Sequence, residues 1–185
     1  MPENDLKNIK KNFEKAKKGD KEFFSKIYEA YFKPLYRYVY LRIGNKAESD
    51  DLVQDIFIKA LNSSEDSASY DSSPIIHFCN VARKSVLDWN RKRRRVLMPH
   101  ENMENYPDEK ASKTEENIKR EDLYNLHNAL ADLSDDGQDA VIFKFMNGLS
   151  DEDIGSILGV SVPSARRLEA QGLILIRDIL KRQYE

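Results

Sequence analysis

The stretch VARKSVLDWNRKRRR, residues Val81–Arg95, decides how this chain folds. On a helix of about 3.6 residues per turn, one side carries the mostly apolar positions of this segment and its approach: Phe78, Val81, Ala82, Ser85, Val86 and Trp89. Lys84, Asp88 and Arg91 lie on another side. The pattern predicts an amphipathic helix with one buried face and one charged face.

Five consecutive basic residues, Arg91–Arg95, end this helix. Such dense positive charge binds a polyanion through counterion release. The alternative is a solvated helix end, because cations complement the negative C-terminal pole of a helix. The run alone supports both interpretations, so the flanking segments have to decide between them.

Composition predicts an all-α protein of one or two small domains. The chain has 185 residues, of which 40% are hydrophobic and 34% charged, and its seven glycines argue against a sheet-rich fold. No apolar run approaches the roughly 20 residues of a spanning helix, so we expect no membrane insertion. The single cysteine, Cys79, excludes an internal disulfide and fits a reducing compartment. We therefore expect a cytoplasmic protein.

Upstream of the basic helix, residues Asp20–Ile43 have helical spacing, which Pro34 should kink or divide in two. The many tyrosines here suit either base stacking or core packing, and packing is the favoured interpretation. Gly44 is expected to end this helix in the left-handed conformation, and Asn45 to cap the next one.

The next predicted helix, Lys46–Leu61, contains DLVQDIFIKA at Asp51–Ala60. Its outer face carries Asp51, Gln54, Asp55 and Ile58. Acids in the first turn complement the positive N-terminal pole, but this does not explain Gln54, Asp55 and the exposed Ile58. An acidic face with one apolar member indicates a docking surface, whereas no further ligands converge for a metal site.

Downstream, apolar periodicity disappears between Val96 and Lys119, which predicts a flexible acidic linker. These 24 residues relax to about 27 Å and stretch to about 80 Å. We therefore expect the two domains to be separate bodies that a larger partner holds apart. The predicted parts are an N-terminal extension (1–19), a helical domain (20–95), the linker (96–119) and a C-terminal domain (120–185).

The C-terminal domain has the pattern of a helix-turn-helix. Ser134 is expected to cap a helix that runs through Met146, Ser150 and Asp153 form a capping box, Gly159 makes the tight turn, and Ser161 caps the last helix. The start of that last helix would enter a DNA major groove with Ser161, Pro163, Ser164, Arg166, Arg167 and Gln171.

The apolar run Leu173–Ile176 cannot all face one side of this last helix. One interpretation is burial against the helix at Leu123–Leu133. The other is cover by a partner protein.

Asp51–Ala60 and Val81–Arg95 together resemble conserved region 2 of bacterial sigma factors of the sigma-70 type, and the helix-turn-helix resembles their region 4. The chain is similar to the small extracytoplasmic-function (ECF) group, which keeps only these two regions. The resemblance covers roughly Gly19–Arg95 and Glu121–Leu180. His77 and Phe78 depart from it, because the family usually has tryptophan and leucine there; we expect His77 and Cys79 to be packing residues.

The resemblance implies roles for the charged surfaces. Asp51, Gln54 and Asp55, with Ile58 beside them, would dock on the largest β-type subunit of core RNA polymerase. The loop Asn62–Pro74 would capture a flipped base of the minus-ten promoter element, with Tyr70 as the stacking ring. The cations that would contact promoter DNA there are Arg83, Lys84, Arg91, Lys92, Arg93, Arg94 and Arg95. Asp88 would pair with Lys84 and Lys92.

The sequence thus predicts a promoter-specificity subunit, with core RNA polymerase, promoter DNA and an anti-sigma factor as the implied partners. We expect no catalytic residues, metal or cofactor. Two alternatives stay open: a helix-turn-helix regulator that does not dock on polymerase, and an adaptor that binds only proteins. The minus-thirty-five element would be bound by the helix-turn-helix.

Overall fold

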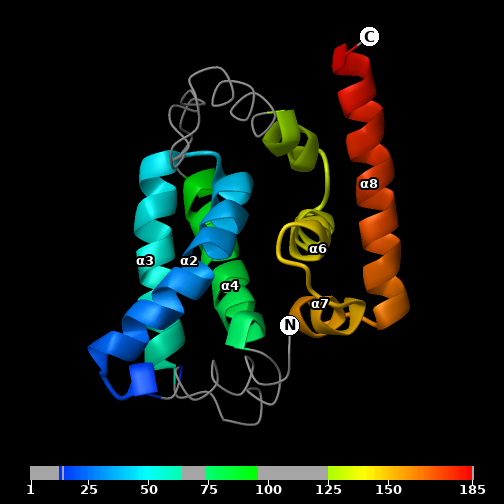
Figure 1. Ribbon diagram of the computed structural model, residues 1–185. Coiled ribbons are helices and arrows are strands. Elements are labelled where there is room, and N and C mark those ends of the chain that lie inside the picture. Colours follow the sequence, from blue (N-terminus) through cyan, green and yellow to red (C-terminus); the bar gives the residue numbers. More distant parts are fainter. Residues whose placement is uncertain (1–12, 14, 64–73, 96–124, 185) are drawn as a thin grey trace.

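The structure is a computed structural model, and it describes residues 13, 15–63, 74–95 and 125–184. In this part of the chain the secondary structure is entirely helical, as predicted (Figure 1). The helices with defined bounds are α2 (Lys21–Ile43), α3 (Lys46–Asn62), α4 (Pro74–Arg95), α6 (Asp135–Phe145), α7 (Asp151–Leu158) and α8 (Val162–Tyr184). Residues 125–131 form a further helical segment. The predicted linker lies outside the described residues.

The first domain is a bundle of α2, α3 and α4 around an aromatic core. The rings of Phe57 and Phe78, from α3 and α4, have centroids 5.0 Å apart, and Tyr31 of α2 lies 5.3 Å from Phe78. These side chains are buried. Burial of such rings supplies most of the driving force for the bundle, and it confirms packing as the role of Tyr31.

Local sequence signals set the ends of α2 and α3 as predicted. Gly44 has φ 68° at the C-terminus of α2, a left-handed conformation that glycine adopts at no steric cost. The Asn45 side chain accepts a hydrogen bond from the backbone N–H of Glu48 at 3.0 Å. The two helices are therefore joined by a tight turn.

Of the two outcomes expected at Pro34, a kink or a division, the division does not occur, because one helix runs through this residue. Proline removes a single backbone donor, and the carbonyl that loses its partner belongs to the exposed Ala30. Water can therefore satisfy that carbonyl, while the buried residues on either side of Pro34 hold the helix to its neighbours.

The N-terminal extension contributes to the core, which the sequence did not indicate. The Phe13 side chain is only 1% exposed. Its ring meets those of His77 and Phe78 edge-on, at centroid distances of 5.8 and 5.6 Å. His77 is itself buried, which confirms it as a packing residue, and its Nε2 lies 2.9 Å from the Ala60 carbonyl oxygen.

The second domain contains the predicted helix-turn-helix in α7 and α8. Ser150 accepts a hydrogen bond from the backbone N–H of Asp153 at 3.1 Å, and Gly159 has φ 69° at the turn. A Cβ on Gly155 would lie 3.0 Å from the Val160 carbonyl oxygen, so a small residue lets the turn fold closely against α7. The Ser134 and Ser161 caps also form as predicted.

The apolar run in α8 is divided between a buried side and an exposed side, and cover of the exposed side by a partner stays a prediction. Ile176 is buried, whereas Leu173 and Ile174 are 42% and 54% exposed. Gly172 lies so close to α6 that an added Cβ would overlap the Val141 side chain, at 2.4 Å from its Cγ2. One side of α8 therefore packs on α6, and the other leaves two large apolar side chains in solvent.

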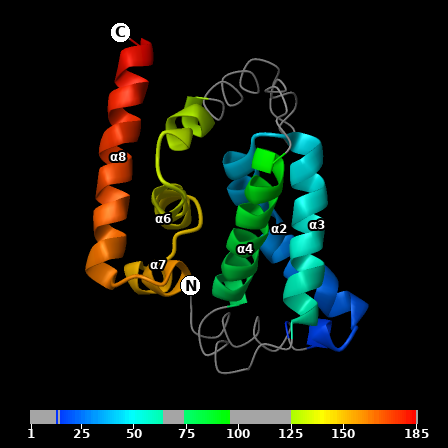
Figure 2. The ribbon, with the colours of Figure 1, turned by 180° about the vertical axis from the view of Figure 1, so that it is seen from behind.

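The two domains pack directly against each other, contrary to the expectation of separate bodies. Figures 1 and 2 show α6 between α8 and the bundle, with α3 on the far side of the bundle. The Tyr38 ring of α2 stacks on Phe143 of α6, with centroids 4.8 Å apart. This contact joins residues that are distant in sequence, so no local pattern indicates it.

We expect the Cys79 thiol to be unreactive in the folded chain. It is fully buried, and burial, followed by the charge of Asp139, raises its pKa, so reagents meet neither an accessible sulfur nor a thiolate. Labelling by a thiol reagent at about pH 8 should be on the order of a hundredfold slower in buffer than in denaturant.

An exposed thiol provides the control for this measurement. The variant Ser25→Cys places a thiol on the exposed face of α2 and should label rapidly with or without denaturant. Equally fast labelling of Cys79 in the native chain would contradict the packing of α4 described above.

Candidate functional site

The outer face of α3 has the predicted arrangement. Asp51, Gln54, Asp55 and Ile58 are all exposed, and the side chain of Ile58 is 58% exposed. The opposite face of the helix is buried in the bundle, so these four residues are held on a rigid element. This face therefore presents two carboxylates, an amide and one apolar side chain to solvent on a fixed element.

The cations in the C-terminal part of α4 differ in their exposure and in their ion-pair partners. Arg91 is exposed and its Nη2 lies 2.6 Å from Asp88 Oδ1, so Asp88 pairs with a residue three positions along the helix. Its pairs with Lys84 and Lys92 stay predictions. Lys84 and Lys92 are exposed. Arg94 and Arg95 belong to the helix, but their side chains lie outside the described residues.

Arg93 is positioned by two neighbours. Its Nη1 lies 3.5 Å from Glu48 Oε1, and its guanidinium carbon lies 4.8 Å from the centre of the Trp89 ring. The Trp89 indole N–H also donates to Glu48. A cation over an aromatic face is stabilised by the ring quadrupole, so Arg93 is partly ordered before any ligand binds.

The region of the predicted base-capturing loop is described only at its borders. Tyr70 and residues 64–73 lie outside the described residues. At the first border, Lys17 Nζ donates to the Ser63 carbonyl oxygen at 2.9 Å, and His77 Nε2 lies 3.0 Å from Ser63 Oγ. The end of α3 is therefore fixed to the N-terminal segment and to α4.

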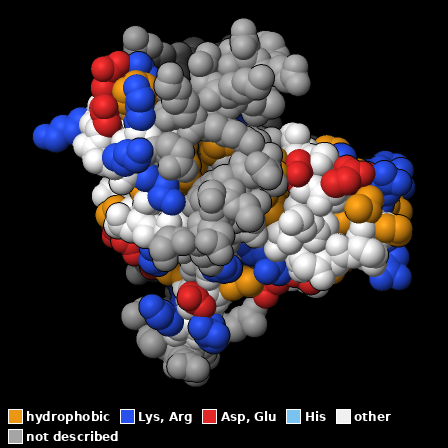
Figure 3. All heavy atoms as spheres, turned by 90° about the horizontal axis from the view of Figure 1, so that it is seen from below, with side chains coloured by type: hydrophobic (Ala, Val, Ile, Leu, Met, Phe, Trp, Pro, Cys, Tyr) orange, Lys and Arg blue, Asp and Glu red, His pale blue; other side chains and the backbone are white. Residues whose placement is uncertain are grey.

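The start of α8 presents the predicted recognition residues. Ser161, Pro163, Arg166, Arg167 and Gln171 are exposed, and Ser164 is half-buried. Seen from below, Lys and Arg side chains gather at the edge of the molecule formed by α7 and the start of α8 (Figure 3). This end of the helix-turn-helix therefore offers positive charge to a ligand.

Asp151 organises part of this surface. Its Oδ2 accepts a hydrogen bond from Arg166 Nε at 2.5 Å, and its Oδ1 accepts one from Lys144. These two hydrogen bonds lower the pKa of the Asp151 carboxyl. Arg166 is consequently tied to α7.

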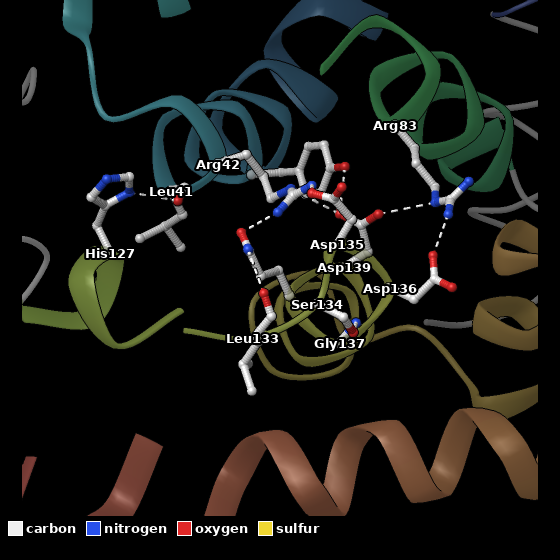
Figure 4. Close-up of polar contacts among 12 residues, drawn as sticks. Leu41, Arg42, Arg83, His127, Leu133, Ser134, Asp135, Asp136, Gly137 and Asp139 are labelled. Atoms are coloured by element: carbon white, nitrogen blue, oxygen red, sulfur yellow. Dashed lines mark hydrogen bonds and ion pairs between the residues drawn. The ribbon is translucent and has the colours of Figure 1, made fainter. Parts of the chain in front are cut away.

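Arg83 is placed differently from the other predicted DNA-contacting residues. Its Nε donates to Asp139 Oδ2 at 2.9 Å and its Nη2 to Asp136 Oδ1 at 2.5 Å, both on α6 (Figure 4). In this arrangement the guanidinium belongs to the contact between the domains, and its DNA contact stays a prediction.

Sequence reasoning missed the other residues that form this contact between the domains. Arg42 of α2 donates from Nη2 to Asp135 Oδ1 at 2.7 Å, and its Nε lies 3.0 Å from Asp139 Oδ1 (Figure 4). The Tyr38 hydroxyl donates to the same Asp139 oxygen at 2.8 Å. Taken singly, Arg42 and Asp135 look like ordinary partners of helix poles, so only the assembled structure reveals the cluster.

Comparison with known proteins identifies the family. The family model for Sigma-70 region 2 matches residues 27–96, which lie in the first domain. The ECF RNA polymerase sigma factors SigX and SigW of Bacillus subtilis are each 25% identical to the chain; the matches cover 84% and 95% of this chain and 82% and 96% of theirs. Residues 27–96 belong to the sigma-70 family. The chain as a whole is similar to ECF sigma factors, as the resemblance predicted.

Further relatives agree with this assignment. The ECF sigma factor BldN of Streptomyces coelicolor is 25% identical to the chain over 169 residues, and the match covers 64% of the length of BldN. The solved structure of CnrH, in complex with the cytosolic domain of CnrY, has a TM-score of 0.69 at 16% identity, covering 94% of this chain and 97% of CnrH. RpoE of Bartonella quintana, solved with the anti-sigma factor NepR, has a TM-score of 0.65 at 22% identity and covers 85% of this chain. These structures confirm the all-helical fold.

As a sigma factor, this chain acts in transcription initiation and is not an enzyme. Among the described residues no group of three or more His, Cys, Asp or Glu side chains is arranged to hold a metal ion. No helix in the described part of the chain combines the length and apolar character that a membrane crossing requires.

We expect Asp151→Asn to lower the thermal midpoint of this sigma factor at neutral pH. The folded-state pKa of Asp151 lies below its ordinary value of 3.8, so the ionised group stabilises the fold above that pH, and this contribution is lost as the pH falls through the folded-state value. The gap between wild type and variant should therefore narrow between about pH 5 and pH 3.

The matched control is Glu152→Gln, which removes an exposed carboxylate from the same turn of α7. Because Glu152 forms none of the hydrogen bonds that Asp151 accepts from Lys144 and Arg166, its midpoint, measured by circular dichroism, should fall less than that of Asp151→Asn at neutral pH. A gap for Asp151→Asn that does not change with pH would contradict the role assigned to the carboxylate.

Proposed function

We propose that this sigma factor docks on core RNA polymerase through α3, binds and melts the minus-ten promoter element with the α4 region, and binds the minus-thirty-five element with the start of α8. The exposed face of Asp51, Gln54, Asp55 and Ile58 is the observation that carries the proposal. Its proposed partner is the largest β-type subunit of polymerase. A polymerase partner also implies the cytoplasm as the place of action.

The support for minus-ten binding is the distribution of cations on α4. Lys84, Arg91 and Lys92 are exposed on a helix whose other side is buried in the bundle. Cations on a rigid helix suit phosphate contacts, which fix the register of a protein on DNA. Tyr70 is proposed to stack on an unpaired base, and stacking on an aromatic ring contributes about 1–3 kcal/mol per base.

The support for upstream binding is the geometry of the helix-turn-helix. Its second helix begins with an exposed cap residue, Ser161, followed by the exposed Arg166 and Arg167. The first residues of a second helix of this kind contact base edges in the major groove. Since Arg166 is tied to Asp151, Arg167 is the better candidate for a base contact.

An anti-sigma factor is a proposed partner as well. RpoE of Bartonella quintana, which shares the fold, was solved with the anti-sigma factor NepR. A purified anti-sigma candidate should compete with core polymerase for this chain; simultaneous binding of both would contradict an inhibitory role.

The variant Asp55→Arg tests polymerase docking. Asp55 is exposed and forms only a long 4.0 Å ion pair with Lys59, so the substitution leaves the bundle intact while reversing a charge on the docking face. Affinity for core polymerase should fall about tenfold or more, since mismatched interface charges cost several kcal/mol. Co-elution with core polymerase and transcription from a selected promoter measure this.

Glu29→Arg is the matched control for docking, because it makes the same charge change at an exposed position of α2. It should bind core polymerase as the wild type does. Unchanged core binding by Asp55→Arg would exclude the α3 face as the docking surface. A wild-type chain that binds duplex DNA but not core polymerase would favour a helix-turn-helix regulator. A wild-type chain that binds neither would favour a protein-binding adaptor.

The variant Arg167→Ala tests upstream recognition. Loss of a base contact should cost about 1–3 kcal/mol on a duplex carrying the upstream element. The duplex would come from run-off transcription of a genomic library, and fluorescence anisotropy would measure binding. Arg177→Ala, at an exposed position further along α8, is the control and should bind normally. An equal loss on every sequence would indicate a phosphate contact instead.

A further inference from the structure

The carboxylate of Asp151 connects α6, α7 and α8. It lies in the first turn of α7, and it accepts hydrogen bonds from Lys144 of α6 and from Arg166 of α8. The Asp151 side chain is 16% exposed, so the carboxylate is shielded from most of the solvent. The hydrogen bonds raise the pKa of both cations and lower the pKa of the carboxyl. All three groups are therefore ionised at neutral pH.

The Arg166 guanidinium is fixed at one nitrogen and open at the other two. Its Nε donates to Asp151 Oδ2 at 2.5 Å, yet its side chain is 63% exposed. Within the described residues, Arg166 has no hydrogen bond or ion pair other than this one. Its Nη1 and Nη2 are thus available, and such a forked pair of donors binds two oxygens of one phosphate.

Arg167, the next residue of α8, is not restrained in this way. It is exposed, and it has no hydrogen bond or ion pair in the described part of the chain. Successive residues of a helix point about 100° apart, so the two arginines reach different parts of a DNA groove. Phosphate contacts fix the register of a protein on DNA, and base contacts read the sequence. The restrained Arg166 suits the first task, and the free Arg167 suits the second.

We propose that Asp151 is a positioning residue for upstream DNA binding: it holds the terminal nitrogens of Arg166 toward one phosphate and so sets the register in which Arg167 meets a base edge. The inference rests on the proposed function of α8, and it adds the residue on which sequence discrimination depends.

The physical basis is the ordering of a long side chain before binding. Immobilising such a side chain at an interface lowers affinity about twofold to tenfold, and Asp151 removes this cost from the complex in which Arg166 keeps one geometry. Complexes with unrelated sequences gain nothing from it, because there the protein slides along the duplex and keeps no single geometry. Asp151 therefore favours the correct site over other DNA.

Two variants of the full chain separate the position of Arg166 from its charge. Asp151→Asn removes the ionised acceptor and leaves the guanidinium mobile. Arg166→Lys keeps the positive charge, but its single nitrogen cannot be anchored on Asp151 while two others bind a phosphate. The control is Glu152→Gln, which removes an exposed carboxylate from the same turn of α7 and leaves the hydrogen bond of Arg166 in place.

The measured quantity is discrimination, which is the ratio of the affinity for a selected duplex to the affinity for a scrambled duplex of the same base composition. The full chain selects the first duplex from a random pool, so that no polymerase is needed. Fluorescence anisotropy gives both affinities over a range of salt concentrations. Each phosphate contact contributes about 0.9 to the slope of log affinity against log salt concentration.

Asp151→Asn and Arg166→Lys should each lower discrimination about threefold to tenfold. Their affinity for the scrambled duplex should equal that of the wild type or exceed it, because neither variant loses a positive charge. Glu152→Gln should discriminate as the wild type does.

The decisive variant is Asp151→Asn in an Arg166→Gln background. Arg166→Gln alone should lower the salt slope on the selected duplex by about one, because the phosphate contact is lost. Adding Asp151→Asn should then lower discrimination no further, since no guanidinium is left to position. A merely structural role of Asp151 would persist in this background.

A further loss of discrimination in the double variant would therefore overturn the proposal. Wild-type discrimination by Arg166→Lys, or a loss in Glu152→Gln equal to that in Asp151→Asn, would overturn it as well. If the wild-type chain prefers no duplex over its scrambled control, the proposed upstream recognition is itself refuted, and this inference with it. If Asp151→Asn does not fold, as judged by circular dichroism, Arg166→Lys at its exposed position decides.

Discussion

The buried carboxylate of Asp139 is the constraint on which the arrangement of the two domains depends. It lies 3.0 Å from Arg42 Nε and 2.9 Å from Arg83 Nε, and it accepts a hydrogen bond from Tyr38. Removing one partner of a buried ion pair costs about 3–5 kcal/mol, because the other charge is left without compensation. The domains are therefore either correctly docked or apart, with little stability for loose intermediate packings.

The surfaces proposed for polymerase docking and for upstream DNA binding lie on α3 and α8, away from this contact. The acidic face of α3 is backed by the aromatic core of the bundle, and the recognition residues of α8 are backed by α6 and α7. Each surface thus keeps its shape whatever the separation of the domains. For a sigma factor, this means that binding chemistry resides in the domains while their spacing can change.

Much of the fold followed from the sequence, because its decisive signals are local. Helix caps such as Asn45 and Ser150, the left-handed Gly44 and the apolar stripe of α3 act within one or two turns of their own helix. Pro34 misled because a missing donor was weighed without the exposed carbonyl that water can satisfy. Helical spacing likewise predicted the exposed positions Asp51, Gln54, Asp55 and Ile58.

The ion pairs that join the two domains, formed by Arg42 and Arg83 with Asp135, Asp136 and Asp139, could not be predicted in this way. A cation in the last turn of α2 and acids in the first turn of α6 are what helix poles favour in any protein, so Arg42 and Asp135 carry no separate signal. Their pairing joins positions 93 residues apart. Phe13 was missed for a similar reason, since a lone aromatic in a lysine-rich segment shows no period.

The contact of Glu48 with Trp89 and Arg93 joins the first turn of α3 to the basic end of α4. The α3 surface proposed to face the polymerase and the α4 surface proposed to face DNA are thereby in direct contact. A displacement of the first turn of α3 would therefore also displace Trp89 and Arg93. Docking on the polymerase, as proposed, would thus also change the position of the α4 cations that are proposed to bind promoter DNA.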